Sequence, residues 1–149
     1  MKKKSEIPVM PDKIHPALKD AFGYRLMHTA LKYRKSLLVI LDEFNLAPPH
    51  LAILRILSDS DLINQAELGK QLDHDKVTIV RIIDGLEKLK FIKRIAGTED
   101  KRERLIQITK EGRAALIQIQ KKNIVREKNF LSPLTETEAE TLKKLIMKL

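Results

Sequence analysis

The sequence contains no cysteine and no tryptophan, and aromatic residues make up only 4% of its 149 positions. The absence of cysteine excludes disulfides, thiolate zinc sites, nucleophilic thiols and thiol-based redox sensing. The shortage of aromatic stacking surface disfavours RNA binding. No apolar run approaches the roughly 18 residues that a membrane-spanning helix needs, and no signal-peptide core follows the first lysines. We therefore expect a cytoplasmic protein without a membrane segment.

Motifs of catalysis are missing as well. The sequence has no glycine-rich phosphate loop, no Gly-x-Ser-x-Gly motif and no run of metal-binding residues. No two of the four histidines, His15, His28, His50 and His74, are three or four positions apart, which argues against a helical metal site. We expect no enzymatic activity, no cofactor and no metal.

The formal net charge of +9 is the first feature that favours a particular kind of partner. Lys and Arg side chains near phosphates release condensed counterions, so a basic protein favours polyanions such as nucleic acids. Basic residues outnumber acidic ones in residues 1–44, 64–113 and 114–149. Because the excess is spread over the chain, charge alone does not separate a nucleic-acid binder from a protein with a well-solvated surface.

The N-terminal third predicts an arm and then a long helix. Prolines and lysines in residues 1–16 are typical of a flexible arm. Residues 17–44 lack proline and repeat apolar side chains at helical spacing, which predicts a helix of about 40 Å. A helix of that length extends beyond what a small domain can cover, so its far end needs a second subunit.

The centre of the chain predicts two short helices. Two prolines in residues 45–63 lead into a short, strongly apolar helix. Asn64 and Glu67 form an Asn-x-x-Glu capping box, which predicts a helix over residues 65–72. A tight polar turn follows.

The next segment predicts a third helix and a charged β-hairpin. The helix is expected over residues 76–90, and the strands over 91–95 and 104–108 around a loop that contains Gly97. Two short helices followed by such a hairpin are the outline of a winged helix-turn-helix, in which the second helix enters the major groove of DNA.

The C-terminal part predicts two more helices. Thr109 is expected to cap a long helix that runs to about Phe130. A second capping box, Thr135 with Glu138, is expected to start a final helix with an apolar face.

The helix over residues 76–90 separates into two faces on a helical wheel. The face expected to pack on the domain comprises Ile79, Ile82, Ile83, Leu86, Leu89 and Lys90. The face expected to point outward comprises Val77, Arg81, Asp84 and Lys88.

The outward face is suited to reading DNA. Arg81 matches a guanine or a phosphate, Thr78 a base or a phosphate, and exposed valines match thymine methyl groups. The alternative is that Val77 and Val80 are buried and that Arg81 is an ordinary surface charge. The residues of this helix predicted to contact DNA are Lys76, Val77, Thr78, Val80 and Arg81. The residues predicted to contact the DNA backbone are Asn64, Gln65 and Lys88.

The tip of the hairpin offers a second contact, through Asp100, Lys101 and Arg102. A long guanidinium can enter a narrow minor groove, where the negative potential is deepest. Asp100 is placed to orient Arg102 by a charge-assisted hydrogen bond. The alternative is that the charged tip is only solvated.

From residue 45 to residue 113 the sequence resembles the MarR (multiple antibiotic resistance regulator) family of winged-helix transcription factors. The matching segments are NLAPPHLAILRIL, NQAELGKQL, DKVTIVRIIDGLEK and FIKRIAGTEDKRERLIQITKEGR. The last segment resembles the wing signature of the family, an Asp-x-Arg followed by a strand and a Thr-x-x-Gly helix start. The sequence departs from the family at Val77, Val80 and Ala47, where many relatives carry Ser or Thr, and at Gly85, where an arginine is common.

The resemblance implies a homodimer whose winged-helix lobes meet successive major grooves of double-stranded DNA and whose wings reach the minor grooves. It makes Arg102 the wing-tip arginine and Asp100 its supporting acid. It also implies a small-molecule effector in the crevice between the dimerisation helices and the winged helix. Tyr24, Arg25, Tyr33 and Arg34 are suited to line such a crevice, but core packing explains the tyrosines equally well, so no ligand residues are assigned.

The sequence therefore predicts a mainly α fold with a small antiparallel β-hairpin. We expect a flexible arm at 1–16, dimerisation helices at 17–44 and 114–149, and a winged helix-turn-helix DNA-binding domain at 45–113. The predicted function is a repressor that binds a pseudo-palindromic operator as a homodimer and is released by a small ligand. The alternative is a winged helix that binds another protein, which an outward face that is apolar throughout would favour.

Overall fold

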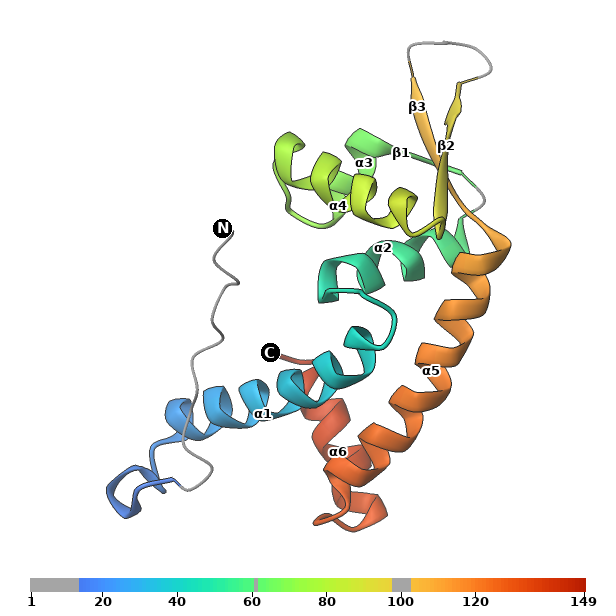
Figure 1. The fold of residues 1–149 in the computed structure, drawn as a ribbon. Coiled ribbons are helices and arrows are strands. Elements are labelled where there is room, and N and C mark those ends of the chain that lie inside the picture. The colour runs from blue at the N-terminus through green and yellow to red at the C-terminus, as the bar shows by residue number, and fades with distance from the viewer. Residues whose placement is uncertain (1–13, 61, 98–102) are drawn as a thin grey trace.

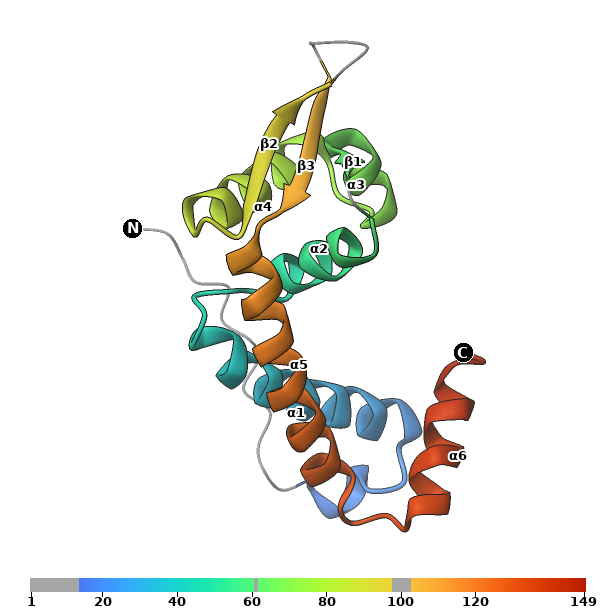
Figure 2. The same ribbon diagram turned by 90° about the vertical axis from the view of Figure 1, so that its right-hand side faces the viewer.

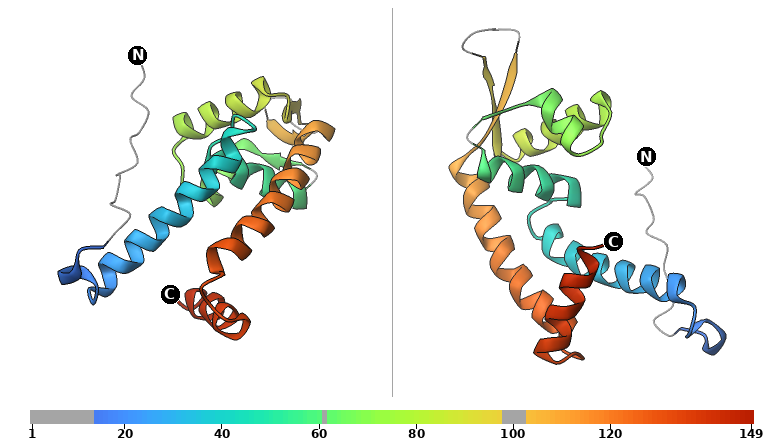
Figure 3. Two further views of the ribbon diagram at one scale, coloured as in Figure 1. Left: turned by 60° about the horizontal axis from the view of Figure 1, so that its bottom comes forward. Right: turned by 180° about the vertical axis from the view of Figure 1, so that it is seen from behind.

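The computed structural model describes residues 14–60, 62–97 and 103–149, and the fold of this part is mainly helical (Figure 1). A β-hairpin projects at one end of the molecule, the C-terminal helix lies at the opposite end, and a long helix connects the two ends (Figure 3). The predicted class, mainly α with a small antiparallel hairpin, is confirmed.

The first long helix is shorter than the sequence predicts. Helix α1 spans Phe22–Asp42, and a separate 3-10 helix, η1 (Pro16–Leu18), precedes it in place of one continuous helix over residues 17–44. Residues 15–23 are all exposed. Helices in proteins are stabilised mainly by the packing of one face, and no such packing holds this segment in the predicted helix.

Three helices form the helical part of the winged domain. They are α2 (Pro48–Asp59), α3 (Gln65–Gln71) and α4 (Lys76–Lys88). The turn from α3 to α4 depends on Asp73, whose φ of 50° lies in the left-handed region. The backbone N–H of His74 then donates to the carbonyl of Gly69 at 2.9 Å, which closes the end of α3. The predicted polar turn is thus a left-handed helix end followed at once by a new helix.

The sheet has three strands in the order β1-β3-β2, all antiparallel. They are β1 (Ile63–Asn64), β2 (Ile92–Ala96) and β3 (Arg104–Ile108). In the register, Ile63 is opposite Ile106, and Ile92 is opposite Ile108. The sequence predicts the two strands of the hairpin, which we call the wing, but not β1.

The core lies between the winged-domain helices, the sheet and the first half of α5 (Lys110–Leu131). Its fully buried side chains include Leu41, Ile53, Leu54, Leu57, Leu68, Ile83, Leu86, Ile106 and Ile119. Thr109 caps α5 as predicted, because its hydroxyl oxygen accepts a hydrogen bond from the N–H of Gly112 at 3.0 Å. Helix α5 therefore begins inside the winged domain and carries its core toward α1.

Helix α5 continues from the base of the wing to α6 (Glu136–Ile146) (Figure 2). The predicted capping box is present, since the N–H of Thr135 donates to Glu138 at 2.8 Å and the N–H of Glu138 donates to Thr135 at 3.3 Å. None of the residues of α6 is buried. An ion pair of 3.1 Å joins Lys143 of α6 to Glu127 of α5. The apolar face of α6 is thus left open.

Candidate nucleic-acid interface

Helix α4, the predicted recognition helix, begins at an aspartate cap. One oxygen of Asp75 accepts a hydrogen bond from the N–H of Thr78 at 2.8 Å, and the other accepts from the Thr78 hydroxyl at 2.7 Å. The backbone bond first, and then the hydroxyl bond, lower the pKa of Asp75. Since the only hydroxyl proton of Thr78 goes to Asp75, the hydroxyl must break this hydrogen bond before it can donate to a phosphate.

The outward face of α4 carries both charged and apolar side chains. Its exposed residues are Lys76, Val77, Arg81, Asp84 and Lys88. Val77 is 79% exposed, so the interpretation that buries it under the preceding helix is wrong. Val80 and Gln65, two other predicted contacts, are half-buried. The face is therefore mixed rather than apolar throughout.

The inward face of α4 follows the helical wheel except at its end. Ile79, Ile82, Ile83 and Leu86 are buried as predicted. Lys90, which the wheel places among them, is exposed. The wheel fails here because α4 ends at Lys88 and the φ of Lys90 is 62°, so this residue no longer follows the helical period.

Asn64 caps α3 and also holds the wing. Its side-chain oxygen accepts a hydrogen bond from the N–H of Ala66 at 2.7 Å, and its amide nitrogen donates to Glu103 at 2.5 Å. The predicted capping box with Glu67 is wrong, because Glu67 accepts a hydrogen bond from Gln71 at 3.1 Å instead. Both polar groups of Asn64 are thus engaged within the protein.

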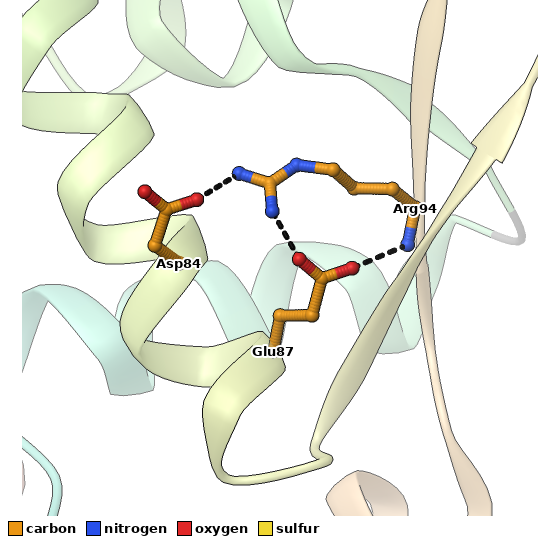
Figure 4. A network of polar contacts seen from close by, with 3 residues as sticks. All are labelled: Asp84, Glu87 and Arg94. Atoms are coloured by element: carbon orange, nitrogen blue, oxygen red, sulfur yellow. Dashed lines mark hydrogen bonds and ion pairs between the residues drawn. The ribbon is translucent and has the colours of Figure 1, made fainter.

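The wing is also tied to α4, through Arg94 at the centre of β2 (Figure 4). One terminal nitrogen of the Arg94 guanidinium pairs with Asp84, and the other pairs with Glu87. The second Glu87 oxygen accepts from the backbone N–H of Arg94 at 3.3 Å. We call these three residues the Arg94 clamp. Sequence reasoning missed it because the pairing depends on how the strand crosses the helix.

The clamp favours the charged form of Arg94. Partial burial acts to lower the pKa of Arg94, but hydrogen bonds and charge attraction from Asp84 and Glu87 outweigh it and raise that pKa. The Arg94 side chain is only 23% exposed, so the pairs are screened less than ordinary surface ion pairs. The negative charge of Asp84, on the outward face of α4, is thereby partly offset, since one guanidinium is shared by two carboxylates.

The predicted wing-tip contacts, Asp100, Lys101 and Arg102, lie outside the residues that the structure describes. The strands leading to the tip are described as far as Gly97 and from Glu103 onward. The backbone N–H of Gly97 donates to the carbonyl of Glu103 at 3.1 Å, which continues the hairpin pairing beyond the strands. The role of the tip residues stays a prediction from the sequence.

Gly85, one of the departures from the family pattern, allows α2 and α4 to approach closely. A Cβ atom at this position would lie 3.0 Å from Nε2 of His50. Nδ1 of His50 accepts a hydrogen bond from the N–H of Ala47 at 2.9 Å, which caps the start of α2. Burial lowers the pKa of His50. The imidazole is therefore held neutral between the two helices.

The residues suited to an effector crevice have packing partners of their own. The ring of Tyr33 meets Phe130 edge-on at 5.0 Å, and the guanidinium of Arg126 lies 4.0 Å from the Tyr33 ring centre. Arg126 also donates to Ser36 at 2.8 Å. Tyr24 stacks on His28 at 6.3 Å. Packing between α1 and α5 thus accounts for Tyr33 without a ligand.

Within residues 14–60, 62–97 and 103–149, no three metal-binding side chains come together, and no helix is both long and apolar enough to cross a bilayer. A cavity of about 430 Å³ lies beside the base of the wing. It is lined by Lys93, Gln107, Ile108, Thr109, Lys110, Glu111 and Arg113.

A short helix, a tight turn, an exposed helix and a clamped hairpin define the class of winged helix-turn-helix proteins. The sequence model of the MarR family matches residues 46–103. These residues are a MarR-family domain, and the resemblance predicted from the sequence is confirmed.

Solved structures with a similar fold cover most of the chain. A probable transcriptional regulator from Pseudomonas aeruginosa is 27% identical, with a TM-score of 0.75 over 88% of this chain and 98% of that one. A variant of MarR from E. coli complexed with operator DNA is 23% identical and has a TM-score of 0.74, covering 87% of this chain and 93% of that one. That likeness establishes the fold.

Relatives found by sequence are named as regulators. The HTH-type transcriptional repressor YetL of Bacillus subtilis is 40% identical over 68 residues, 44% of this chain and 41% of that protein. A protein of Thauera aromatica, named as a regulator of the hcr operon, is 23% identical over 91% of this chain and 82% of its own length. These names describe regulators and not enzymes.

Proposed function

We propose that this chain is a sequence-specific transcriptional regulator that binds a pseudo-palindromic operator in double-stranded DNA as a homodimer. In this proposal α4 lies in the major groove, and Lys76, Val77, Val80 and Arg81 meet the bases or their flanking phosphates. Thr78 joins them only if it releases Asp75. The wing reaches the adjacent minor groove through Arg102.

The observation that carries the proposal is the exposed N-terminal half of α4. A valine that is 79% exposed, one turn from an exposed arginine, has no packing role of its own. Apolar contacts to thymine methyl groups and arginine contacts to guanine are the standard ways of reading base edges in the major groove. The clamped wing beside α4 completes a surface that follows two grooves.

The homodimer is supported by the apolar surface at the other end of the molecule. Phe22 and Met27 of α1 are 73% and 59% exposed, and Leu145 and Ile146 of α6 are 53% and 55% exposed. Apolar patches of this kind on helix faces mark interaction sites. A second copy of the chain would cover them, in keeping with the dimerisation helices predicted at 17–44 and 114–149.

The finer part of the proposal is that the protein is a repressor released by a small ligand. Support comes from one relative, YetL, which is named a repressor. Displacement of the bound operator by small aromatic acids, followed by fluorescence anisotropy, tests this part. Complexes that withstand every such compound at millimolar concentration would leave DNA binding in place and remove this kind of effector.

The proposed binding is tested by selecting bound fragments from a random pool of duplex DNA. We expect enrichment of a two-fold symmetric sequence with half-sites about 10 base pairs apart. The affinity should fall steeply with salt, because phosphate contacts release counterions. If no sequence is enriched and no duplex is retained in dilute buffer, the proposal fails. The mixed face of α4 gives no support to a protein-binding winged helix.

A further inference from the structure

We propose that Arg94 is a positioning residue that fixes the angle between the wing and α4, and that this angle determines how well the protein distinguishes its operator from other DNA. This inference rests on the proposed DNA-binding function. In it Arg94 makes no contact with DNA and acts through the hairpin that it holds.

The contacts of Arg94 restrain direction as well as distance. Asp84 and Glu87 are three positions apart on α4 and therefore lie on one side of the helix. Each takes one terminal nitrogen of the Arg94 guanidinium, and Glu87 also accepts the backbone N–H of Arg94 at 3.3 Å. Side chain and strand are thus both bound to α4, so the strand cannot rotate about its axis without breaking a charge-assisted bond.

The other strand of the wing has its own attachment. Glu103, next to β3, accepts a hydrogen bond from the Asn64 amide at 2.5 Å, and Asn64 caps α3. The two helices of the helix-turn-helix each hold one side of the hairpin. The apolar contacts beneath the sheet are not directional, so the polar contacts are what define the angle.

The electrostatics of the clamp also suit a DNA-binding face. Asp84 is 57% exposed at the side chain and shares the outward face of α4 with Arg81 and Lys88. A free carboxylate there would repel phosphates. Because both terminal nitrogens of Arg94 pair with Asp84 and Glu87, this side chain lowers the negative charge of the surface and does not extend to the phosphates.

Arg94→Lys separates geometry from charge. Lysine keeps the positive charge but presents a single ammonium group in place of a planar fork, so it cannot hold both carboxylates in the same arrangement. Arg104→Lys is a matched control, because Arg104 is an exposed arginine on the neighbouring strand with no ion pair among the described residues. Asp84→Asn with Glu87→Gln opens the clamp from the α4 side.

A measurement without DNA tests the angle itself. The chain has no cysteine, so spin labels at Val77→Cys and Ala96→Cys report the distance between α4 and the wing, with labelled protein diluted into unlabelled protein. We expect a narrow distance distribution in the parent and in Arg104→Lys, and a broader or shifted one in Arg94→Lys and in the double variant. A distribution that stays narrow in both clamp variants overturns the proposal.

A measurement with DNA tests the consequence. We expect the ratio of operator affinity to random-duplex affinity to fall about tenfold in Arg94→Lys, the size of effect that coupled charged groups produce, and to persist in Arg104→Lys. Circular dichroism checks that each variant is folded. An unchanged ratio overturns the inference. That result is expected if Arg94 binds phosphate directly, because affinity for both DNAs would then change equally. If the parent binds no duplex at all, the proposed function fails, while the label distances still decide whether the clamp sets the angle.

Discussion

At the scale of single residues, two glycines lie where a neighbouring group occupies the place of a side chain. A Cβ at Gly85 would lie 3.0 Å from the imidazole of His50, and a Cβ at Gly112 would lie 2.1 Å from the carbonyl oxygen of Phe91. Glycine costs a helix about 1 kcal/mol relative to alanine. At these two positions the absence of a side chain allows α4 to lie close to α2, and α5 to lie close to the start of the hairpin.

Gly112→Ala should destabilise the protein in spite of the better helix propensity of alanine. The added methyl group meets backbone rather than a movable side chain, so α5 or the start of β2 has to shift. We expect the free energy of unfolding to fall by about 1 to 3 kcal/mol, the usual cost of overpacking. Urea unfolding followed by circular dichroism measures the change.

The matched control is Gly23→Ala in the first turn of α1, where nothing lies within 4 Å of the added Cβ. This variant should be neutral or more stable by about 0.4 to 1 kcal/mol. Equal effects of the two substitutions would show that the contact with Phe91 carries no cost.

His50 should make stability depend on pH. Its Nδ1 must be unprotonated to accept the hydrogen bond from Ala47, and burial lowers its pKa below the usual 6.5. The unfolded chain therefore binds a proton more readily than the folded one, so stability is greatest above pH 6.5 and declines as the pH falls through that value. Chemical unfolding measured at pH 7.5 and at pH about 5.5 should show this decline.

His50→Gln provides the control for the pH effect. Glutamine at the third position of a helix can accept the same N–H as the partner in a capping box, but it does not titrate. The decline between the two pH values should be smaller in this variant than in the parent. An identical decline would assign the pH dependence to other groups.

At the scale of elements, the periodic parts of the fold were predictable and the pairings across the fold were not. The apolar spacing of Ile79, Ile83 and Leu86 identifies the buried face of α4 because a helix repeats every 3.6 residues. Strand β1 has two residues and pairs with β3, about forty positions away, so no local pattern reveals it. Arg94 looks like an ordinary strand residue until the crossing of β2 over α4 places it beside two carboxylates.

The candidate site shows the same division. Helical spacing was sufficient to place Arg81 and Val77 on the outward face of α4. It was not sufficient to show that Asp75 accepts a hydrogen bond from the Thr78 hydroxyl or that Glu103 accepts one from the Asn64 amide. Hydrogen bonds depend on side-chain conformation and on distant segments, which a sequence pattern does not contain.

For the recognition helix, Arg81→Ala should weaken binding to the preferred operator by about 1 to 3 kcal/mol if Arg81 reads a guanine. Affinity for random duplex should change much less. Lys88→Ala is the comparison, because a predicted phosphate contact should lose affinity equally on both DNAs. Anisotropy titrations on the two duplexes separate the cases. Equal losses for Arg81→Ala would assign it to phosphate instead.

For the wing, Arg102→Ala should weaken binding to most sequences and lower the slope of log affinity against log salt by about one. The expectation comes from the sequence, in which a long guanidinium near the hairpin tip is suited to the minor groove. Titrations at several salt concentrations measure the slope. An unchanged slope would remove Arg102 from the contacts.

At the scale of the whole molecule, the exposed apolar side chains of α1 and α6 lie at the end opposite the proposed DNA surface (Figure 3). Leu142, Leu145 and Ile146 are exposed on α6, and Phe22 and Met27 are exposed on α1. Helix α5 connects this end to the base of the wing as one continuous helix. An interface between two copies at the apolar end would therefore set the separation of the two recognition helices.

Leu145→Asp should produce a monomer and, with it, a loss of operator binding. A carboxylate in an apolar interface loses its hydration without gaining a partner, which disfavours association. Size-exclusion chromatography with light scattering measures the mass, and anisotropy measures the affinity. Val77→Ser is the matched control, because it removes an equally apolar and more exposed side chain from α4 and should weaken operator binding while the protein stays dimeric.

Moving the half-sites apart by about 5 base pairs, half a helical turn, should abolish tight binding by the parent. A Leu145→Asp monomer that binds the operator as tightly as the parent would exclude the dimer as the DNA-binding form.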